Sequence, residues 1–273
     1  MVEGMLGGHA GPSFSGCRGV GRLVEAKRRR QSPAGGRGAG VSGSAVRIMR
    51  QTEPIKIDTQ STQSELTLIL AGGGLRSLVA TAAARSSVAA ASVRLLHLRD
   101  HRTNDPPRRK AARLQAKHYG IERLIELELP NLGARHGPDQ PREMARVALH
   151  SIQLLTIALA QAAELGVSRI VWPAQVDADF DRCAALTEQA VLLQTAARHE
   201  FEHAAEIESP LLELDDQQVI ELGGQLEVPW ETAWSCLLQG DHPCRVCAAC
   251  RRRHTAFDAA GVVDPIDETA PAR

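Results

Sequence analysis

The chain has 273 residues, and its 32 lysine and arginine residues are balanced by 32 aspartate and glutamate residues. This balance excludes the strong positive field that draws a whole protein non-specifically to nucleic acid. Aromatic residues make up only 3% of the sequence, so aliphatic side chains must fill the core, and a platform for stacking bases is not expected.

Residues 1–64 are rich in glycine, serine and arginine and show neither a helix period nor a strand period. Such a segment buries too little apolar surface to offset the entropy lost on ordering, so we expect a disordered tail. Its basic run from Lys27 to Arg30 has two interpretations, contact with nucleic acid or a solvated stretch upstream of a later start at Met49. We therefore begin the folded part at residue 65.

From residue 66 onward, short apolar runs alternate with longer segments of helical period. Strands are predicted over residues 66–70, 92–98, 122–129, 168–171 and 204–208. Helices are predicted over residues 75–85, 106–119, 143–165, 183–198 and 215–225. This alternation predicts an α/β domain over residues 65–228, built on a doubly wound parallel sheet of about five strands.

A run of glycines stands between the first predicted strand and the first predicted helix. Gly72, Gly73 and Gly74 lead into Arg76 and Ser77 at the start of the helix. Consecutive glycines let backbone N–H groups converge on an anion, and a helix N-terminus adds favourable partial charge. The run therefore predicts a phosphate or nucleotide site, and the alternative is a tight turn in which glycine only relieves steric strain.

Acidic residues follow two of the predicted strands. Asp100 comes after the second strand, and Asp177, Asp179 and Asp181 come after the fourth. Open α/β sheets bind ligands at the carboxyl ends of their strands. We therefore regard Asp100, Asp177 and Asp181 as candidates for binding magnesium or polar substrate groups, with a solvated acidic loop as the alternative.

Four of the six cysteines lie close together, at Cys236, Cys244, Cys247 and Cys250. Their spacing supplies four thiolates for tetrahedral zinc, and such a closed set is structural because catalytic zinc keeps one position open. The alternative is a group of reduced cysteines without metal. We expect residues 229–265 to form a zinc-binding segment packed on the α/β domain. A metal site, the lack of a run of about 18 apolar residues and the lack of a signal core predict a cytoplasmic protein.

The order of motifs near the C-terminus is specific. Residues 228–236 read Val-Pro-Trp-Glu-Thr-Ala-Trp-Ser-Cys, and the three further cysteines follow. This arrangement resembles the 7-cyano-7-deazaguanine synthase (QueC-like) family of the queuosine pathway, and the resemblance covers about 200 residues. It implies an adenine nucleotide hydrolase-like fold of the ATP pyrophosphatase type. It also implies ATP- and magnesium-dependent adenylation of 7-carboxy-7-deazaguanine, followed by reaction with ammonia to give an amide and then a nitrile.

The resemblance also assigns residues. The family's phosphate loop reads Ser-Gly-Gly-x-Asp-Ser, so Gly72 stands at its serine and Arg76 at its aspartate, and Asp216 stands where a lysine is expected. Two functions follow: the synthase reaction itself, or an impaired paralogue that binds nucleotides or purines or assists assembly. Opposite charges at Arg76 and Asp216 also allow an ion pair between them. The partners implied are a 7-deazapurine and ATP, with no membrane and no nucleic acid for the folded domain, and a homo-oligomer is left open.

Overall fold

The computed structural model describes residues 66–100, 102–129, 150–177 and 179–268. The expectations for residues 1–64 lie outside these ranges. The strands are β1 (Thr67–Leu70), β2 (Val93–Arg99), β3 (Arg123–Glu128), β4 (Arg169–Val171) and β5 (Glu206–Glu208). The helices are α2 (Leu75–Arg85), α3 (Asp105–His118), α4 (Ser151–Glu164), α5 (Phe180–Glu200), α6 (Asp216–Gln225), α7 (Ala248–Ala260) and the short α8 (Pro265–Glu268), with 3-10 turns η2 (Ala90–Ser92) and η3 (Trp230–Thr232).

The five strands form one parallel sheet in the order β3-β2-β1-β4-β5, which confirms the predicted fold class. From β1 the chain adds β2 and β3 on one side, and it then returns to the other side of β1 to add β4 and β5. Thr67 of β1 is therefore in register with Val93 on one side and with Arg169 on the other. The strand order reverses between β1 and β4, and a ligand crevice is expected at the carboxyl ends of these strands.

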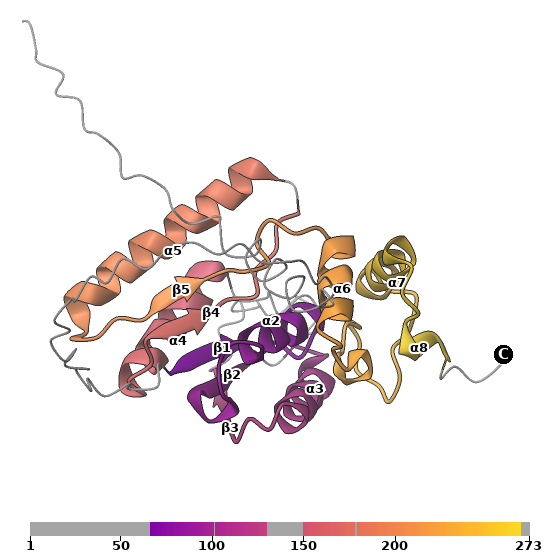
Figure 1. Ribbon diagram of the computed structural model, residues 1–273, viewed down its shortest axis with the longest axis horizontal. Coiled ribbons are helices and arrows are strands. Elements are labelled where there is room, and N and C mark those ends of the chain that lie inside the picture. The colour runs from indigo at the N-terminus through magenta and orange to yellow at the C-terminus, as the bar shows by residue number, and fades with distance from the viewer. Residues whose placement is uncertain (1–65, 101, 130–149, 178, 269–273) are drawn as a thin grey trace, which may run out of the picture. The chain divides into compact units, whose positions relative to one another are not determined.

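Helices cover both faces of the sheet because the side chains of β1 alternate between two cores. Ile69 and Ala71 face a core that takes residues from α2, α3, α6 and α7. Leu68 and Leu70 face a second core that takes residues from α4 and α5. Figure 1 shows α6 and α7 side by side near the C-terminal end of the described chain. This packing brings the segment that follows the cysteines against the domain.

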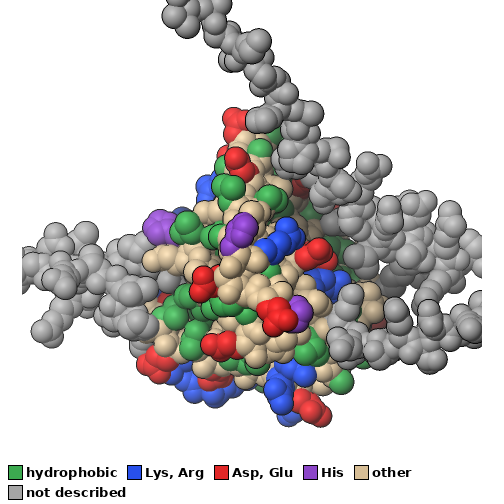
Figure 2. Space-filling model, turned by 90° about the vertical axis from the view of Figure 1, so that its left-hand side faces the viewer, with side chains coloured by type: hydrophobic (Ala, Val, Ile, Leu, Met, Phe, Trp, Pro, Cys, Tyr) green, Lys and Arg blue, Asp and Glu red, His purple; other side chains and the backbone are tan. Residues whose placement is uncertain are grey.

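The surface in the view of Figure 2 carries basic, acidic and apolar side chains in a mixed pattern. No single-charge patch dominates the described part of this face, in keeping with the equal numbers of basic and acidic residues in the chain. Within the described ranges, no helix is both long enough and apolar enough to span a lipid bilayer.

Two helix boundaries differ from the sequence prediction. The helix predicted from residue 143 begins at Ser151, because His150 is extended and caps the helix by a reciprocal pair of hydrogen bonds with Gln153. Ile152 in the first turn is 50% exposed. Residues 130–149 lie outside the described ranges. α5 begins at Phe180 and is longer than predicted, because Asp179 accepts a hydrogen bond from the Arg182 N–H and caps it.

Candidate functional site

A cavity of about 860 Å³ opens at the carboxyl ends of the strands beside the switch point. Its lining comes from the loop after β1, the loop after β2, the segment after β4, and the first turns of α2 and α6. The segment around the first cysteine and α7 close the other side. The lining residues used below are Gly72, Gly74, Arg76, Ser77, Asp100, Arg102, Arg108, Arg182, Asp216, Arg252 and Arg253.

The conformation of Gly73 requires glycine. Its φ of +73° lies in the left-handed region, and a Cβ atom there would lie 2.2 Å from the carbonyl oxygen of Arg108. The Gly73 carbonyl accepts a hydrogen bond from the Trp234 N–H at 2.9 Å, and the Gly72 carbonyl accepts one from Arg108 Nε at 2.9 Å. The loop is therefore a tight turn held from two sides, so the steric interpretation of the glycines holds at Gly73.

The N-terminus of α2 is open toward the cavity. Gly74 is its N-cap residue and supplies no side-chain cap, and the first turn contains no acidic residue. The buried Ser77 hydroxyl donates to the Gly74 carbonyl at 3.0 Å and does not cap the first-turn N–H groups. These N–H groups are the donors that a helix offers to an anion. The glycine run thus combines a tight turn with a helix N-terminus that has no side-chain cap.

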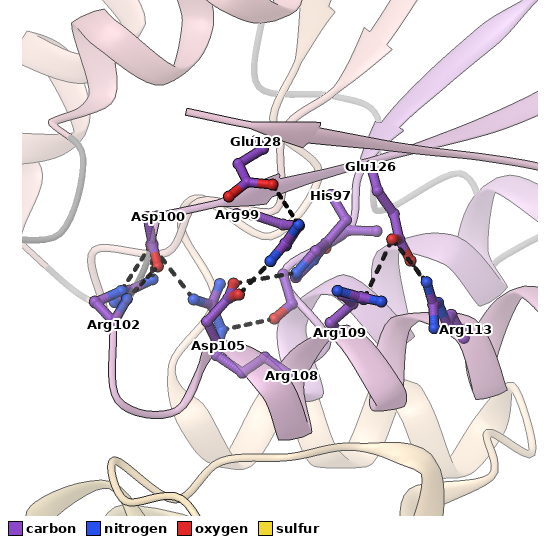
Figure 3. A network of polar contacts seen from close by, with 12 residues as sticks. His97, Arg99, Asp100, Arg102, Asp105, Arg108, Arg109, Arg113, Glu126 and Glu128 are labelled. Carbon is purple, nitrogen blue, oxygen red and sulfur yellow. Dashed lines mark hydrogen bonds and ion pairs between the residues drawn. The ribbon is translucent and has the colours of Figure 1, made fainter. Parts of the chain in front are cut away.

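Asp100 is held by two arginines at the same edge of the sheet (Figure 3). Its Oδ2 atom lies 2.6 Å from Arg102 Nη2 and 3.5 Å from Arg108 Nη1. Burial opposes ionisation of Asp100, but the hydrogen bonds and charge of Arg102 and the charge of Arg108 outweigh it and lower the pKa of this carboxyl. Asp100 is therefore a paired carboxylate that holds two guanidinium groups beside the cavity.

Arg252 of α7 binds two of the other acidic residues. Its Nη2 atom lies 2.8 Å from Asp216 Oδ1 and 3.1 Å from Asp177 Oδ1, and its Nε also donates to Asp216. The pairing of Asp216 with Arg76 that the sequence allowed is therefore wrong, because Arg252 occupies that carboxylate. Arg252 was missed because the helix that carries it was not predicted.

Arg76 lies in the first turn of α2 and opens onto the cavity. Among the described residues it forms no ion pair. The surrounding protein removes part of its solvation, and this desolvation together with the like charge of Arg252 lowers the pKa of its guanidinium, although Asp216 and Asp177 act in the opposite direction. An arginine remains charged at any physiological pH. Two guanidinium groups thus face the cavity near the helix N-terminus.

The candidate aspartates after β4 lie at different places relative to the cavity. Asp177 reaches the cavity edge through Arg252, whereas Asp181 is exposed in the first turn of α5 and does not line the cavity. Its neighbour Arg182 does line it. The structure therefore places Asp100 in the cavity lining, connects Asp177 to it only through Arg252 and leaves Asp181 outside it.

The four cysteines converge as predicted. The Sγ atoms of Cys236, Cys244, Cys247 and Cys250 all lie within 4.8 Å of one another. Cys247 Sγ is 4.0 Å from Cys236 Sγ, and two sulfurs on one tetrahedral zinc ion are about 3.8 Å apart. Backbone N–H groups of Leu238 and Cys244 point at Cys236 Sγ, and that of Cys247 points at Cys244 Sγ, each at 3.4 Å. These N–H groups stabilise thiolates, so the donor set fits a four-coordinate metal.

A buried network behind the glycine loop was not predicted. His97 is fully buried in β2, and its Nδ1 lies 2.7 Å from the Ala71 carbonyl, directly before the glycines. Figure 3 shows Asp105 of α3 facing the other ring nitrogen, 3.7 Å from Nε2. The available signal was a histidine between two leucines, Leu96 and Leu98, of this strand. His97 therefore supports the start of the loop from behind.

Comparison with known proteins places this chain in a family. The family model for the queuosine biosynthesis protein QueC matches residues 66–261. The 7-cyano-7-deazaguanine synthase of Chlorobaculum parvum is 26% identical over 219 residues, which cover 73% of this chain and 95% of that protein. The synthase of Chlorobium chlorochromatii is 27% identical over 222 residues, with 75% and 96% covered. The synthase of Trichodesmium erythraeum is 36% identical over 107 residues, with 39% and 47% covered.

Among solved structures, the U34-tRNA thiolase NcsA from Methanococcus maripaludis is 15% identical, with a TM-score of 0.40 over 77% of this chain and 67% of its own. That similarity is too low to bear on function. The family match, by contrast, spans every described strand and all four cysteines. It confirms the resemblance seen in the sequence, and the chain belongs to the QueC family of queuosine biosynthesis proteins.

Proposed function

We propose that this chain is a ligand-binding member of the QueC family, which holds a nucleotide and a 7-deazapurine carboxylate in the cavity without efficient adenylate transfer. The observation that carries the proposal is the pairing of Arg252 with Asp216 and Asp177, next to the unpaired Arg76. Adenylation needs a metal ion and donors placed on the transferring phosphoryl group. The carboxylates beside the helix N-terminus are instead bound to arginine.

Binding itself is supported by features that do not depend on those carboxylates. The first-turn N–H groups of α2 have no side-chain cap, and Gly74 leaves the backbone accessible from the cavity. Arg76 and Arg252 add positive charge at the same end. A cavity of about 860 Å³ falls within the range of small-molecule sites.

The second candidate is the synthase reaction itself, the ATP-dependent ligation of ammonia to a deazapurine carboxylate. It is favoured by the relatives, since two curated 7-cyano-7-deazaguanine synthases match this chain over 95% or more of their own length. For that reaction, a residue other than Arg76 would have to hold magnesium. The first proposal is preferred because it agrees with the charges at the cavity.

Zinc is the metal of the cysteine site in this proposal. Four thiolates saturate a tetrahedral ion, leave no position for water and suit zinc in a structural role. Residues 229–265 would then fold around the ion, because metal affinity becomes folding energy in such segments. Elemental analysis of the purified chain should find about one zinc per chain and no stoichiometric iron. A stoichiometric iron content would replace zinc in the proposal.

The function is tested by measuring binding and turnover on the same preparation. ATP and 7-carboxy-7-deazaguanine are titrated separately, and AMP and pyrophosphate are then quantified with both ligands, magnesium and ammonia present. We expect saturable binding and no AMP above the rate without protein. Robust magnesium-dependent AMP formation, absent in Gly73→Val, would instead establish the synthase reaction. If neither ATP nor 7-carboxy-7-deazaguanine binds, both candidate functions are ruled out.

A further inference from the structure

We propose that the cavity binds the polyphosphate of its nucleotide as a metal-free anion, with guanidinium groups in the place of a magnesium ion. This inference rests on the proposed function, because it assumes that a nucleotide binds in the cavity. It goes further by specifying the ionic form of the ligand. It predicts that magnesium opposes binding, which is the reverse of ordinary nucleotide sites.

The first step is that the cavity has no free carboxylate among its described lining residues. Two aspartates line it, Asp100 and Asp216. Asp100 is bound by Arg102 and Arg108, and Asp216 is bound by Arg252. Magnesium in nucleotide sites is usually held by one or two carboxylates together with the phosphates. An ion entering this cavity would have to break an arginine pair before it gained a protein ligand.

The second step is the excess of positive charge. Six arginines line the same cavity as the two aspartates. Arg253 is satisfied within the protein by Asp264, at 2.6 and 2.8 Å, but the others remain at the cavity wall. Arg76 has no acidic partner among the described residues, and Arg252 lies close enough to lower its pKa. Two neighbouring guanidinium groups repel each other, and an anion between them would relieve that repulsion.

The third step concerns the oxygens of the ligand. Guanidinium groups bind phosphate through pairs of N–H bonds to non-bridging oxygens. Magnesium coordinates the same oxygens, retains water molecules and removes two negative charges from the polyphosphate. A magnesium complex would therefore offer Arg76 fewer acceptors and would place a divalent cation beside it. The free anion can accept hydrogen bonds from Arg76, from Arg252 and from the uncapped first-turn N–H groups of α2 together.

The test is a titration of ATP by calorimetry with the zinc-loaded chain in two chelator-free buffers of equal ionic strength, one stripped of magnesium on a resin beforehand and one with excess magnesium chloride. We expect binding in the magnesium-free buffer to be at least about tenfold tighter, the change expected for one hydrogen-bonded charged pair. Inorganic tripolyphosphate should compete with ATP in the magnesium-free buffer. Equal affinity in both buffers, or tighter binding with magnesium, would overturn the inference while leaving the proposed function standing. Absence of ATP binding in both buffers would remove the proposed function as well.

Substitutions of Arg76 test its assigned role directly. Arg76→Asp puts a carboxylate at the helix N-terminus, so it should weaken binding in the magnesium-free buffer and make added magnesium favourable. Arg76→Gln should weaken binding in the magnesium-free buffer without that reversal. Arg123→Gln is the matched control, because Arg123 is exposed on β3 and does not line the cavity. Melting temperatures check that each variant is folded. If Arg76→Asp and Arg76→Gln both bind ATP as the unaltered chain does, the assignment of Arg76 is wrong.

Discussion

The side-chain amide of Asn104 donates a hydrogen bond of 2.9 Å to the carbonyl oxygen of Cys236. This buried contact ties the N-terminal end of α3 to the first residue of the cysteine cluster. Trp234 Nε1 donates to the same carbonyl at 3.0 Å, and the backbone N–H of Trp234 donates to Gly73. One hydrogen-bonded chain therefore joins the metal site to the glycine loop.

Replacing Asn104 should weaken this connection. In Asn104→Ala the Cys236 carbonyl keeps only the bond from Trp234, so we expect a loss of about 1 kcal/mol in the free energy of unfolding. Urea denaturation measures that loss, and a parallel titration should show weaker ATP binding. Thr103→Ala is the control, since Thr103 is exposed beside it. Equal stability of the two variants would show that the contact contributes nothing.

Removal of the metal should act at a distance on the cavity. Chelation or Cys247→Ser is expected to expose residues 229–265 to proteolysis and to reduce ATP affinity, because Trp234 and Arg252 are positioned from either side of the cluster. Restoring zinc to the chelated chain should restore both properties. Cys183→Ser provides the control, since Cys183 lies on α5 outside the cluster. ATP affinity unchanged by metal loss would contradict the connection.

Substitution by alanine should reduce the free energy of unfolding more at Gly73 than at Gly120. Both residues have positive φ, +73° and +62°, but a Cβ at Gly73 meets the Arg108 carbonyl whereas Gly120 has open space around it. We expect Gly120→Ala to lose about 1 kcal/mol of stability and keep ligand binding. Gly73→Ala should lose more than about 2 kcal/mol and abolish ATP binding, because the backbone must move. Similar losses in the two variants would show that the close approach is unimportant.

His97 should make stability fall under mildly acidic conditions. Burial is the main cause that lowers its pKa, and Arg108 adds to it, while the Ala71 carbonyl, Asp105 and Glu126 act in the opposite direction. The unfolded chain therefore takes up a proton first. Stability from this group is present above the unfolded pKa of about 6.5 and is lost as pH falls below it. His97→Asn should flatten the dependence between about pH 7 and 5, and the exposed His118→Gln should not.

The sheet was predictable because β1, β2 and β4 contain short apolar runs next to segments of helical period, and this local pattern survives in the fold. The start of α4 could not be predicted. The apolar period of the sequence continues upstream of Ser151, whereas hydrogen bonds between His150 and Gln153 fix the N-terminal boundary of the helix. α7 was missed because its arginine-rich sequence has little apolar period.

The four cysteines could be assigned from spacing alone, since their ligand chemistry is local in sequence. The ion pairs around the cavity could not be assigned from the sequence. Arg252 is separated from Asp216 by 36 residues and from Asp177 by 75, so only the packing of α7 on α6 brings them together. The opposite charges of Arg76 and Asp216 made their pairing a reasonable prediction. That prediction lacked Arg252, which binds Asp216 from α7, a helix that had not been predicted.

The position of Arg252 in the chain also has a consequence for biosynthesis. The ribosome makes the glycine loop early, whereas Arg252 follows the last strand and the last cysteine of the cluster. A nascent chain whose sheet has already formed still lacks this guanidinium, and Asp216 and Asp177 then lie without the partner that they have in the completed fold. The cavity therefore reaches its final charge only after α7 has left the exit tunnel and docked.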